Sequence, residues 1–161
     1  MNKLLLSVHV AASIIFIGPI TVAASLFPRF ARQALVDGGG GSSAVAAAMH
    51  RITCVYAVLG LAVPVVGIVL AVKMGVLTDL WIVLSLVVTL GAAGVLAGLV
   101  LPAQRGLMAA ITGASEKPSA DQDSRLLRTA RRLSMFTGVF SLLWLVVVVL
   151  MIARPGSTTG I

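Results

Sequence analysis

The sequence has few of the charged groups with which a soluble protein covers its surface. Only 11% of its 161 residues are charged, whereas 59% are apolar. A soluble domain has about a quarter charged residues. The length suits one domain, so it is the missing polar surface that excludes a water-soluble fold. The composition therefore predicts lipid as the main solvent.

Acidic residues are absent from the long apolar runs. All five lie between the runs, namely Asp37, Asp79, Glu116, Asp121 and Asp123. Proton-coupled transporters and pumps depend on carboxylates or histidine chains inside the membrane, and many hydrolases depend on paired acids. The absence excludes a carboxylate relay, disfavours a coupled transporter and points away from an enzyme.

The chain has one cysteine, Cys54, inside an apolar run. A single cysteine excludes an intrachain disulfide and any CxxC metal or redox motif. We interpret it as a small packing residue.

Four apolar runs are long enough to cross a bilayer, which takes about 20 residues as a helix. They span roughly residues 4–27, 52–72, 80–101 and 136–152. Because backbone groups in lipid must bond to one another, each run is predicted to be a helix. The expected fold is an all-α membrane protein, one up-and-down bundle of four transmembrane helices over residues 1–161. A signal peptide is the alternative for the first run, but its length favours a retained helix.

Two long linkers are expected, over residues 28–51 and 102–135, and a tight turn with Gly75 joins the middle spans. A flexible hinge is expected at Gly38–Ser43. Residues 126–133 have helical periodicity and can run into the fourth span. The arginines of this stretch are expected to bind anionic lipid headgroups; they are Arg125, Arg128, Arg131 and Arg132.

The distribution of basic residues predicts the orientation. Lys3, Lys73 and Arg154 lie on one side of the membrane, and the other nine of the 12 basic residues lie on the opposite side. The positive-inside rule then puts both termini outside a bacterial cytoplasmic (inner) membrane and both long linkers inside. The net charge of +7 does not indicate nucleic-acid binding, because no basic stripe is interleaved with aromatic residues.

His9 is the one ionisable residue well inside a span, and such a residue is a functional hypothesis by default. Neutral imidazole is a common haem or metal ligand; the alternative is a histidine hydrogen-bonded to a neighbouring helix. His50 is expected at the opposite membrane face, as an anchor for an interfacial helix. At the depth of His9 we expect Met74, Trp81 and Met151, of which Met151 is a weak second-ligand candidate.

Small residues and prolines mark the spans. Gly91, Gly94 and Gly98 form a stripe that includes a GxxxG motif, which permits close helix approach. The stripe can pack within the bundle or serve a homodimer or a partner subunit. Pro19 and Pro64 are expected to kink their helices.

Four short motifs carry a resemblance to a known family. They are the segment from His9 to Gly18, the Pro64–Gly67 stretch, the Leu101-Pro102 pair and the segment from Met151 to Gly156. Over nearly its whole length the chain resembles the uncharacterised membrane family DUF2269, a relative of the CopD-like group of copper-resistance protein CopD and the oxidase HemJ. The resemblance implies a four-helix bundle and a haem b or copper role for His9.

The sequence leaves three functions open. The first is a small non-enzymatic membrane protein that serves as an accessory or stabilising subunit of a membrane complex. The second is a redox protein that binds haem b or copper through His9. The third is a passive channel, for which few polar residues are available to line a pore.

Overall fold

The computed structural model describes residues 2–37, 40–113 and 120–156. These residues form α1 (Asn2–Asp37), α2 (Gly40–Gly60), α3 (Ala62–Met74), α4 (Leu80–Val95), η1 (Leu96–Val100), α5 (Leu101–Thr112) and α6 (Ala120–Ala153). Four stretches are long and apolar enough to cross a membrane, namely Leu4–Val36, Gly40–Met74, Leu80–Thr112 and Ser124–Ala153. The predicted all-α protein with four transmembrane helices is confirmed.

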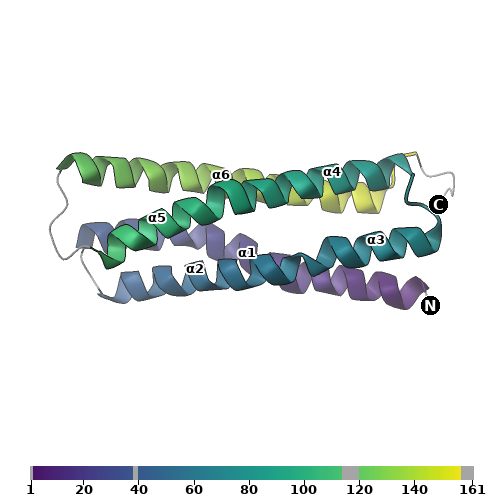
Figure 1. The fold of residues 1–161 in the computed structure, drawn as a ribbon, viewed down its shortest axis with the longest axis horizontal. Coiled ribbons are helices and arrows are strands. Elements are labelled where there is room, and N and C mark those ends of the chain that lie inside the picture. The colour runs from purple at the N-terminus through teal and green to yellow at the C-terminus, as the bar shows by residue number, and fades with distance from the viewer. Residues whose placement is uncertain (1, 38–39, 114–119, 157–161) are drawn as a thin grey trace.

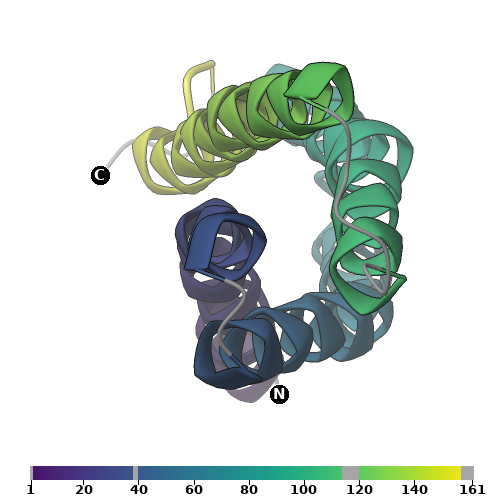
Figure 2. The same cartoon turned by 90° about the vertical axis from the view of Figure 1, so that its left-hand side faces the viewer.

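The spans run up and down along one long bundle (Figure 1). The start of α1, the end of α6 and the α3–α4 connection lie at one end, which we call the terminal end. The end of α1, the start of α2, the end of α5 and the start of α6 lie at the other, which we call the arginine end. Seen end-on, the spans follow one another in chain order (Figure 2), and α1 contacts both α2 and α6. This packing puts residues from all four spans near one another at each end.

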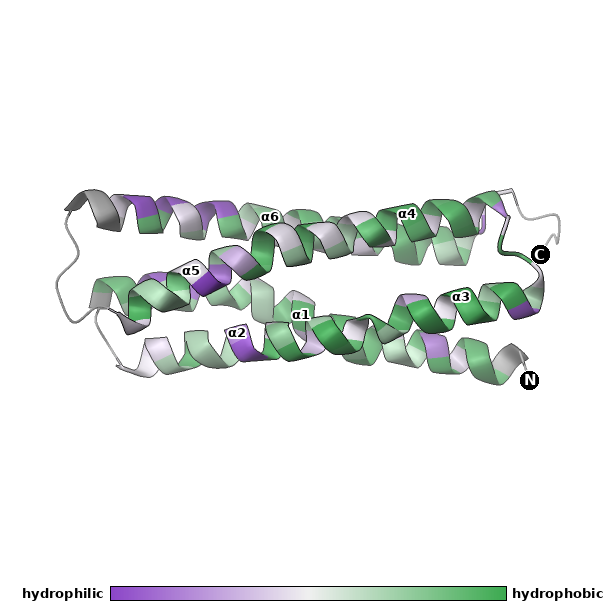
Figure 3. Cartoon of the chain, viewed as in Figure 1, coloured by the Kyte–Doolittle hydropathy of each residue, from purple (hydrophilic) through white to green (hydrophobic). Residues whose placement is uncertain are grey.

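Arginines mark one border of an apolar slab. The arginine of α6 nearest to the terminal end is Arg132, which lies 21 residues before Ala153. That separation is about 31 Å at 1.5 Å per residue, close to the hydrocarbon thickness of about 30 Å. Hydrophilic residues on α2, α5 and α6 gather towards the arginine end in Figure 3. The membrane-embedded part of the bundle therefore begins at the terminal end, and the helices continue beyond it at the arginine end.

The helices are longer than the sequence predicts, because most of residues 28–51 and 102–135 is helical. Apolar residues of these regions are fully buried, among them Ala31, Ala46, Leu107 and Leu133, and their burial holds the extensions together. The predicted helix over residues 126–133 is confirmed and is continuous with the fourth span in α6. On it Ala130 and Leu133 are buried, whereas Leu127 is exposed.

The expected hinge at Gly38–Ser43 differs from the structure, because Gly40–Ser43 form the first turn of α2. The hydroxyl of Ser43 donates to the carbonyl oxygen of Gly40 at 2.9 Å. Gly38, Gly39 and residues 114–119 of the second expected linker lie outside the described residues. The predicted turn at Gly75 is confirmed, since Gly75 ends α3 with φ 69° and donates to the carbonyl oxygen of Val72.

Prolines shape two of the spans. The second span breaks at Leu61, between α2 and α3, because the ring of Pro64 clashes with the helical carbonyl four residues earlier, at Gly60. The third span was expected to end at Leu101, where its apolar run ends, but the helix continues to Thr112. The π-helical turn η1 precedes Pro102 and loosens the helix enough for it to continue as α5. At Pro19, α1 continues without interruption.

The hydrophobic core occupies the middle of the bundle and its arginine half. Its largest fully buried apolar side chains are Ile20, Phe27, Leu107 and Leu133. The core cluster continues through Phe140 and Leu96 in the middle of the bundle. Closer to the terminal end the four spans enclose a pocket instead.

Candidate functional site

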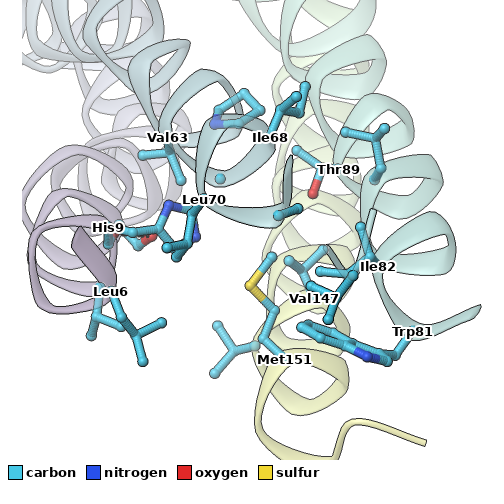
Figure 4. Close-up of a pocket in the computed structure, with 18 of the residues that line it drawn as sticks. Leu6, His9, Val63, Ile68, Leu70, Trp81, Ile82, Thr89, Val147 and Met151 are labelled. Atoms are coloured by element: carbon cyan, nitrogen blue, oxygen red, sulfur yellow. Dashed lines mark hydrogen bonds between the residues drawn. The ribbon is translucent and has the colours of Figure 1, made fainter. Parts of the chain in front are cut away.

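The pocket opens between α1 and α3 on one side and α4 and α6 on the other. Its volume is about 540 Å³, within the range of roughly 300–1,000 Å³ that is usual for ligand sites. The lining shown in Figure 4 is largely apolar, with Leu6, Val63, Ile82 and Val147 among the labelled residues. Such a site suits a ligand that dissolves in the membrane.

His9 projects from α1 into the wall of this pocket (Figure 4) and is 5% exposed. Its Nδ1 atom is buried and has no hydrogen-bond partner among the described residues. The ring lies close to the backbone of Val63 on α3, but the geometry falls short of a hydrogen bond. Because an unpaired buried polar atom costs about 1–3 kcal/mol, this nitrogen requires an explanation. The approach of the ring to the Val63 backbone corresponds to the alternative expected from the sequence, a histidine that bonds to a neighbouring helix.

Gly67 holds the imidazole from the α3 side. A Cβ atom at this position would stand 2.9 Å from the Cε1 atom of His9 and 3.5 Å from each ring nitrogen. Carbon atoms in contact are normally about 3.5–4.0 Å apart, so a side chain here would displace the ring. The absence of a side chain at Gly67, in the Pro64–Gly67 stretch, therefore leaves room for the imidazole ring of His9.

The opposite wall carries the groups that the sequence places at the depth of His9. Met151 of α6 and Trp81 of α4 line the pocket with Met74 and Trp144, and Figure 4 shows Met151 across the pocket from His9. Trp81 lies in the first turn of α4. Its ring is 6% exposed and faces the pocket.

A cation lies in the lining of the pocket beside Trp81. The guanidinium carbon of Arg154 lies 5.4 Å from the centre of the Trp81 ring, a cation–π distance. The indole nitrogen donates to the carboxylate of Asp79 at 3.2 Å. Arg154 has a φ of 42°, and this left-handed conformation costs a non-glycine residue about 1–2 kcal/mol. This backbone conformation occurs at the residue whose guanidinium lies over Trp81 in the pocket wall.

A second polar group lies near the arginine end. The Nδ1 atom of His50 is 2.9 Å from Oε1 of Gln104, and the Sγ atom of Cys54 is 3.6 Å from Nε2 of His50. His50 thus bonds inside the bundle instead of anchoring an interfacial helix. His50 and His9 do lie towards opposite ends, as predicted. The sequence analysis missed Gln104 because it expected the third span to end at Leu101. Gln104 would have been a candidate if the helix had been continued through residues 101–112.

The glycine stripe faces outward. Gly91, Gly94 and Gly98 are exposed, and an added Cβ atom would meet nothing within 4 Å at any of them. No helix from the described part of the chain packs against the stripe. The four arginines of α6 are likewise exposed; they are Arg125, Arg128, Arg131 and Arg132.

Residues 3–155 match the family described as predicted integral membrane protein, DUF2269. The chain belongs to this family. As a member of DUF2269 it is a multi-pass integral membrane protein in contact with the lipid bilayer. No curated protein and no solved structure matches it significantly.

Proposed function

We propose that this DUF2269 protein is a non-enzymatic membrane protein that binds haem b in the pocket, with His9 as an axial ligand. The single observation that carries the proposal is the unpaired ring nitrogen of His9, buried in the wall of an apolar pocket of about 540 Å³. A buried imidazole without a partner is suited to a ligand that supplies the missing interaction.

The backbone beside His9 suits a histidine that binds a metal. Such a histidine usually donates its other ring N–H to a backbone carbonyl or a carboxylate. The backbone of Val63 lies beside the ring and would accept that N–H while the other ring nitrogen held the iron.

Other pocket residues suit the remaining parts of a haem. The thioether of Met151 on the opposite wall can serve as a second axial ligand, and methionine–histidine ligation raises a haem potential. Arg154 in the pocket lining could pair with the acidic substituents of the haem. Bound haem would supply one-electron redox chemistry.

Copper is the alternative cofactor. The pocket offers one imidazole and the thioethers of Met74 and Met151, and soft thioether ligands select Cu(I). Among the described residues no three His, Cys, Asp or Glu side chains form a metal-binding group. The apolar volume therefore favours haem over a bare ion.

An absorption spectrum and a metal analysis of the protein purified in mild detergent test the proposal. We expect a Soret band with about one haem per chain, lost in His9→Ala and retained in the matched control His50→Ala. Near-stoichiometric copper without a Soret band would favour the copper alternative. Neither haem nor copper at such a level, or a band unchanged in His9→Ala, would contradict ligation by His9.

An accessory or stabilising role in a membrane complex is a second candidate, favoured by the outward-facing glycine stripe. Small residues let two helices approach closely in lipid, and Gly91, Gly94 and Gly98 have open space beside them. A homodimer or a partner subunit can occupy it. We expect Gly94→Leu to abolish a complex that is seen by cross-linking in membranes; a complex unchanged by Gly94→Leu would contradict this role.

For orientation, we propose both termini outside the bacterial cytoplasmic membrane and the arginine end inside, with the exposed arginines of α6 against anionic headgroups. The support is the positive-inside rule, together with an attraction of about 1 kcal/mol per cation near an anionic surface. Cysteines introduced at Ser42 and Ser157, in a Cys54→Ser background, test it in intact cells. A membrane-impermeant reagent should label position 157 only, and labelling of position 42 alone would reverse the orientation.

A further inference from the structure

Three residues from two spans form a chain of close polar contacts apart from the pocket. His50 and Cys54 lie one turn apart on α2, and Gln104 comes from α5. Nδ1 of His50 lies 2.9 Å from Oε1 of Gln104; because an amide oxygen only accepts, Nδ1 carries the proton and Nε2 of the neutral ring is unprotonated. The Sγ atom of Cys54 lies 3.6 Å from Nε2 and 3.9 Å from Nδ1, so the thiol packs against the ring, with the unprotonated nitrogen as its nearer neighbour.

The arrangement has the parts of an activated nucleophile. A thiol gains reactivity when a neighbouring base takes its proton and a third group orients that base. Gln104 is fully buried, and its Nε2 has no hydrogen-bond partner among the described residues. One end of the amide thus orients His50, and the other offers a free donor within the same cluster. Cys54 itself is only partly buried, as a reactive thiol must be.

The depth of the cluster indicates the kind of substrate. Cys54 lies 20 residues before the end of α3 at Met74, which is about 30 Å from the terminal end. This is the border of the apolar slab on the arginine side. An acyl chain lying in the hydrocarbon brings its carbonyl group to such a border.

Exposed arginines follow two members of the cluster directly. Arg51 is next to His50 and Arg105 is next to Gln104, and both side chains are exposed. Guanidinium groups recognise phosphate through paired hydrogen bonds. A donor with a phosphate-bearing carrier and an acyl chain fits both features.

We propose that Cys54 is a nucleophilic thiol, activated by His50, that accepts an acyl group from a long-chain acyl thioester. The Sγ atom bonds to the carbonyl carbon, and the carbon–sulfur bond to the carrier breaks. The proton that His50 takes from Cys54 passes to the departing thiolate, so the products are S-acylated Cys54 and the free carrier thiol. The inference does not depend on haem binding at the other end of the bundle.

The single cysteine makes the test direct. The purified protein in lipid nanodiscs is incubated with palmitoyl coenzyme A and followed by intact mass. A parallel reaction with N-ethylmaleimide at neutral pH measures the reactivity of the thiol in the absence of an acyl donor. Thr53→Val is the matched control, because the Thr53 hydroxyl donates only within its own helix, to Met49.

We expect a palmitoyl adduct that hydroxylamine removes, at a rate unchanged in Thr53→Val. Both reactions should slow at least about tenfold at neutral pH in His50→Ala and His50→Gln, since general bases contribute 10²–10⁴-fold. Arg51→Gln should slow acylation but leave the maleimide rate unchanged.

Two results would overturn the proposal. One is the absence of a hydroxylamine-labile adduct on the native chain. The other is a native maleimide rate in both His50 variants, once circular dichroism has shown that they are folded. Either result leaves the haem proposal standing, because that proposal rests on His9.

Discussion

Replacing Gly67 with alanine puts a methyl group 2.9 Å from the Cε1 atom of His9. The contact is at least about 0.6 Å shorter than normal carbon–carbon packing, so the imidazole or α3 has to move. Inserting a methyl group into a packed site costs about 1–3 kcal/mol. Alanine also favours a helix over glycine by about 1 kcal/mol, and this gain has to be separated from the steric cost.

Gly138→Ala provides that separation. Gly138 lies within α6, is exposed, and has nothing within 4 Å of an added Cβ atom. Both variants gain the same helix propensity, so the difference between them isolates the clash. We expect Gly67→Ala to be less stable than Gly138→Ala by about 1–3 kcal/mol. Unfolding with sodium dodecyl sulfate in mixed micelles measures this difference.

A double variant then assigns the clash to the histidine. His9→Ala removes the ring that the new methyl group meets, so the two substitutions should be coupled by about 0.5–3 kcal/mol. In the double variant, alanine at position 67 should no longer be destabilising. Equal stability of Gly67→Ala and Gly138→Ala, or strictly additive effects of His9→Ala and Gly67→Ala, would refute the packing described here.

Three further predictions concern other parts of the molecule. Gln104→Leu should lower the unfolding free energy by about 1–3 kcal/mol, because its histidine partner loses a buried acceptor; exposed Gln33→Leu should have little effect in the same micelle titration. A cysteine at Thr78, in the α3–α4 connection, should react with an impermeant reagent in intact cells, whereas one at Ser43 should react only after lysis; the reverse pattern would contradict the proposed orientation. Gly94→Ala should leave monomer stability unchanged or slightly raised, since its Cβ meets open space; a loss above about 1 kcal/mol would mean that a helix packs there.

The fold was predictable from the sequence because the bilayer restricts the choices. A run of about 20 apolar residues in lipid has to be helical, and four such runs in a chain of 161 residues form a bundle. The depth of His9 followed from counting helical turns. That count placed Met74, Trp81 and Met151 at the same depth, and all three line the pocket with it.

The helix ends were not predictable in the same way. Residues 28–37 and 40–51 are less apolar than a span, and their helicity depends on small side chains such as Ala31 and Ala46 that bury against other helices. Hydropathy does not contain this information. Only the packing of one span on the next reveals it.

The contacts between spans were also not predictable from the sequence. Gly67 packs against His9, which lies 58 residues earlier in the sequence, and Gln104 contacts His50, which lies 54 residues earlier. Both contacts depend on the rotation of each helix about its axis. The Pro64 break and the π-helical turn before Pro102 change that rotation, so ideal helical counting does not predict it.

Haemin titration, followed by tryptophan fluorescence and by the Soret band, tests the central claim most directly. The chain has two tryptophans, and both Trp81 and Trp144 line the pocket. We predict quenching that saturates at one haemin per chain, together with a shifted Soret band. His9→Ala should weaken binding at least about tenfold, or about 1.4 kcal/mol, and abolish the shift. Quenching that does not saturate, or an unchanged affinity and spectrum in His9→Ala, would contradict haem binding through His9.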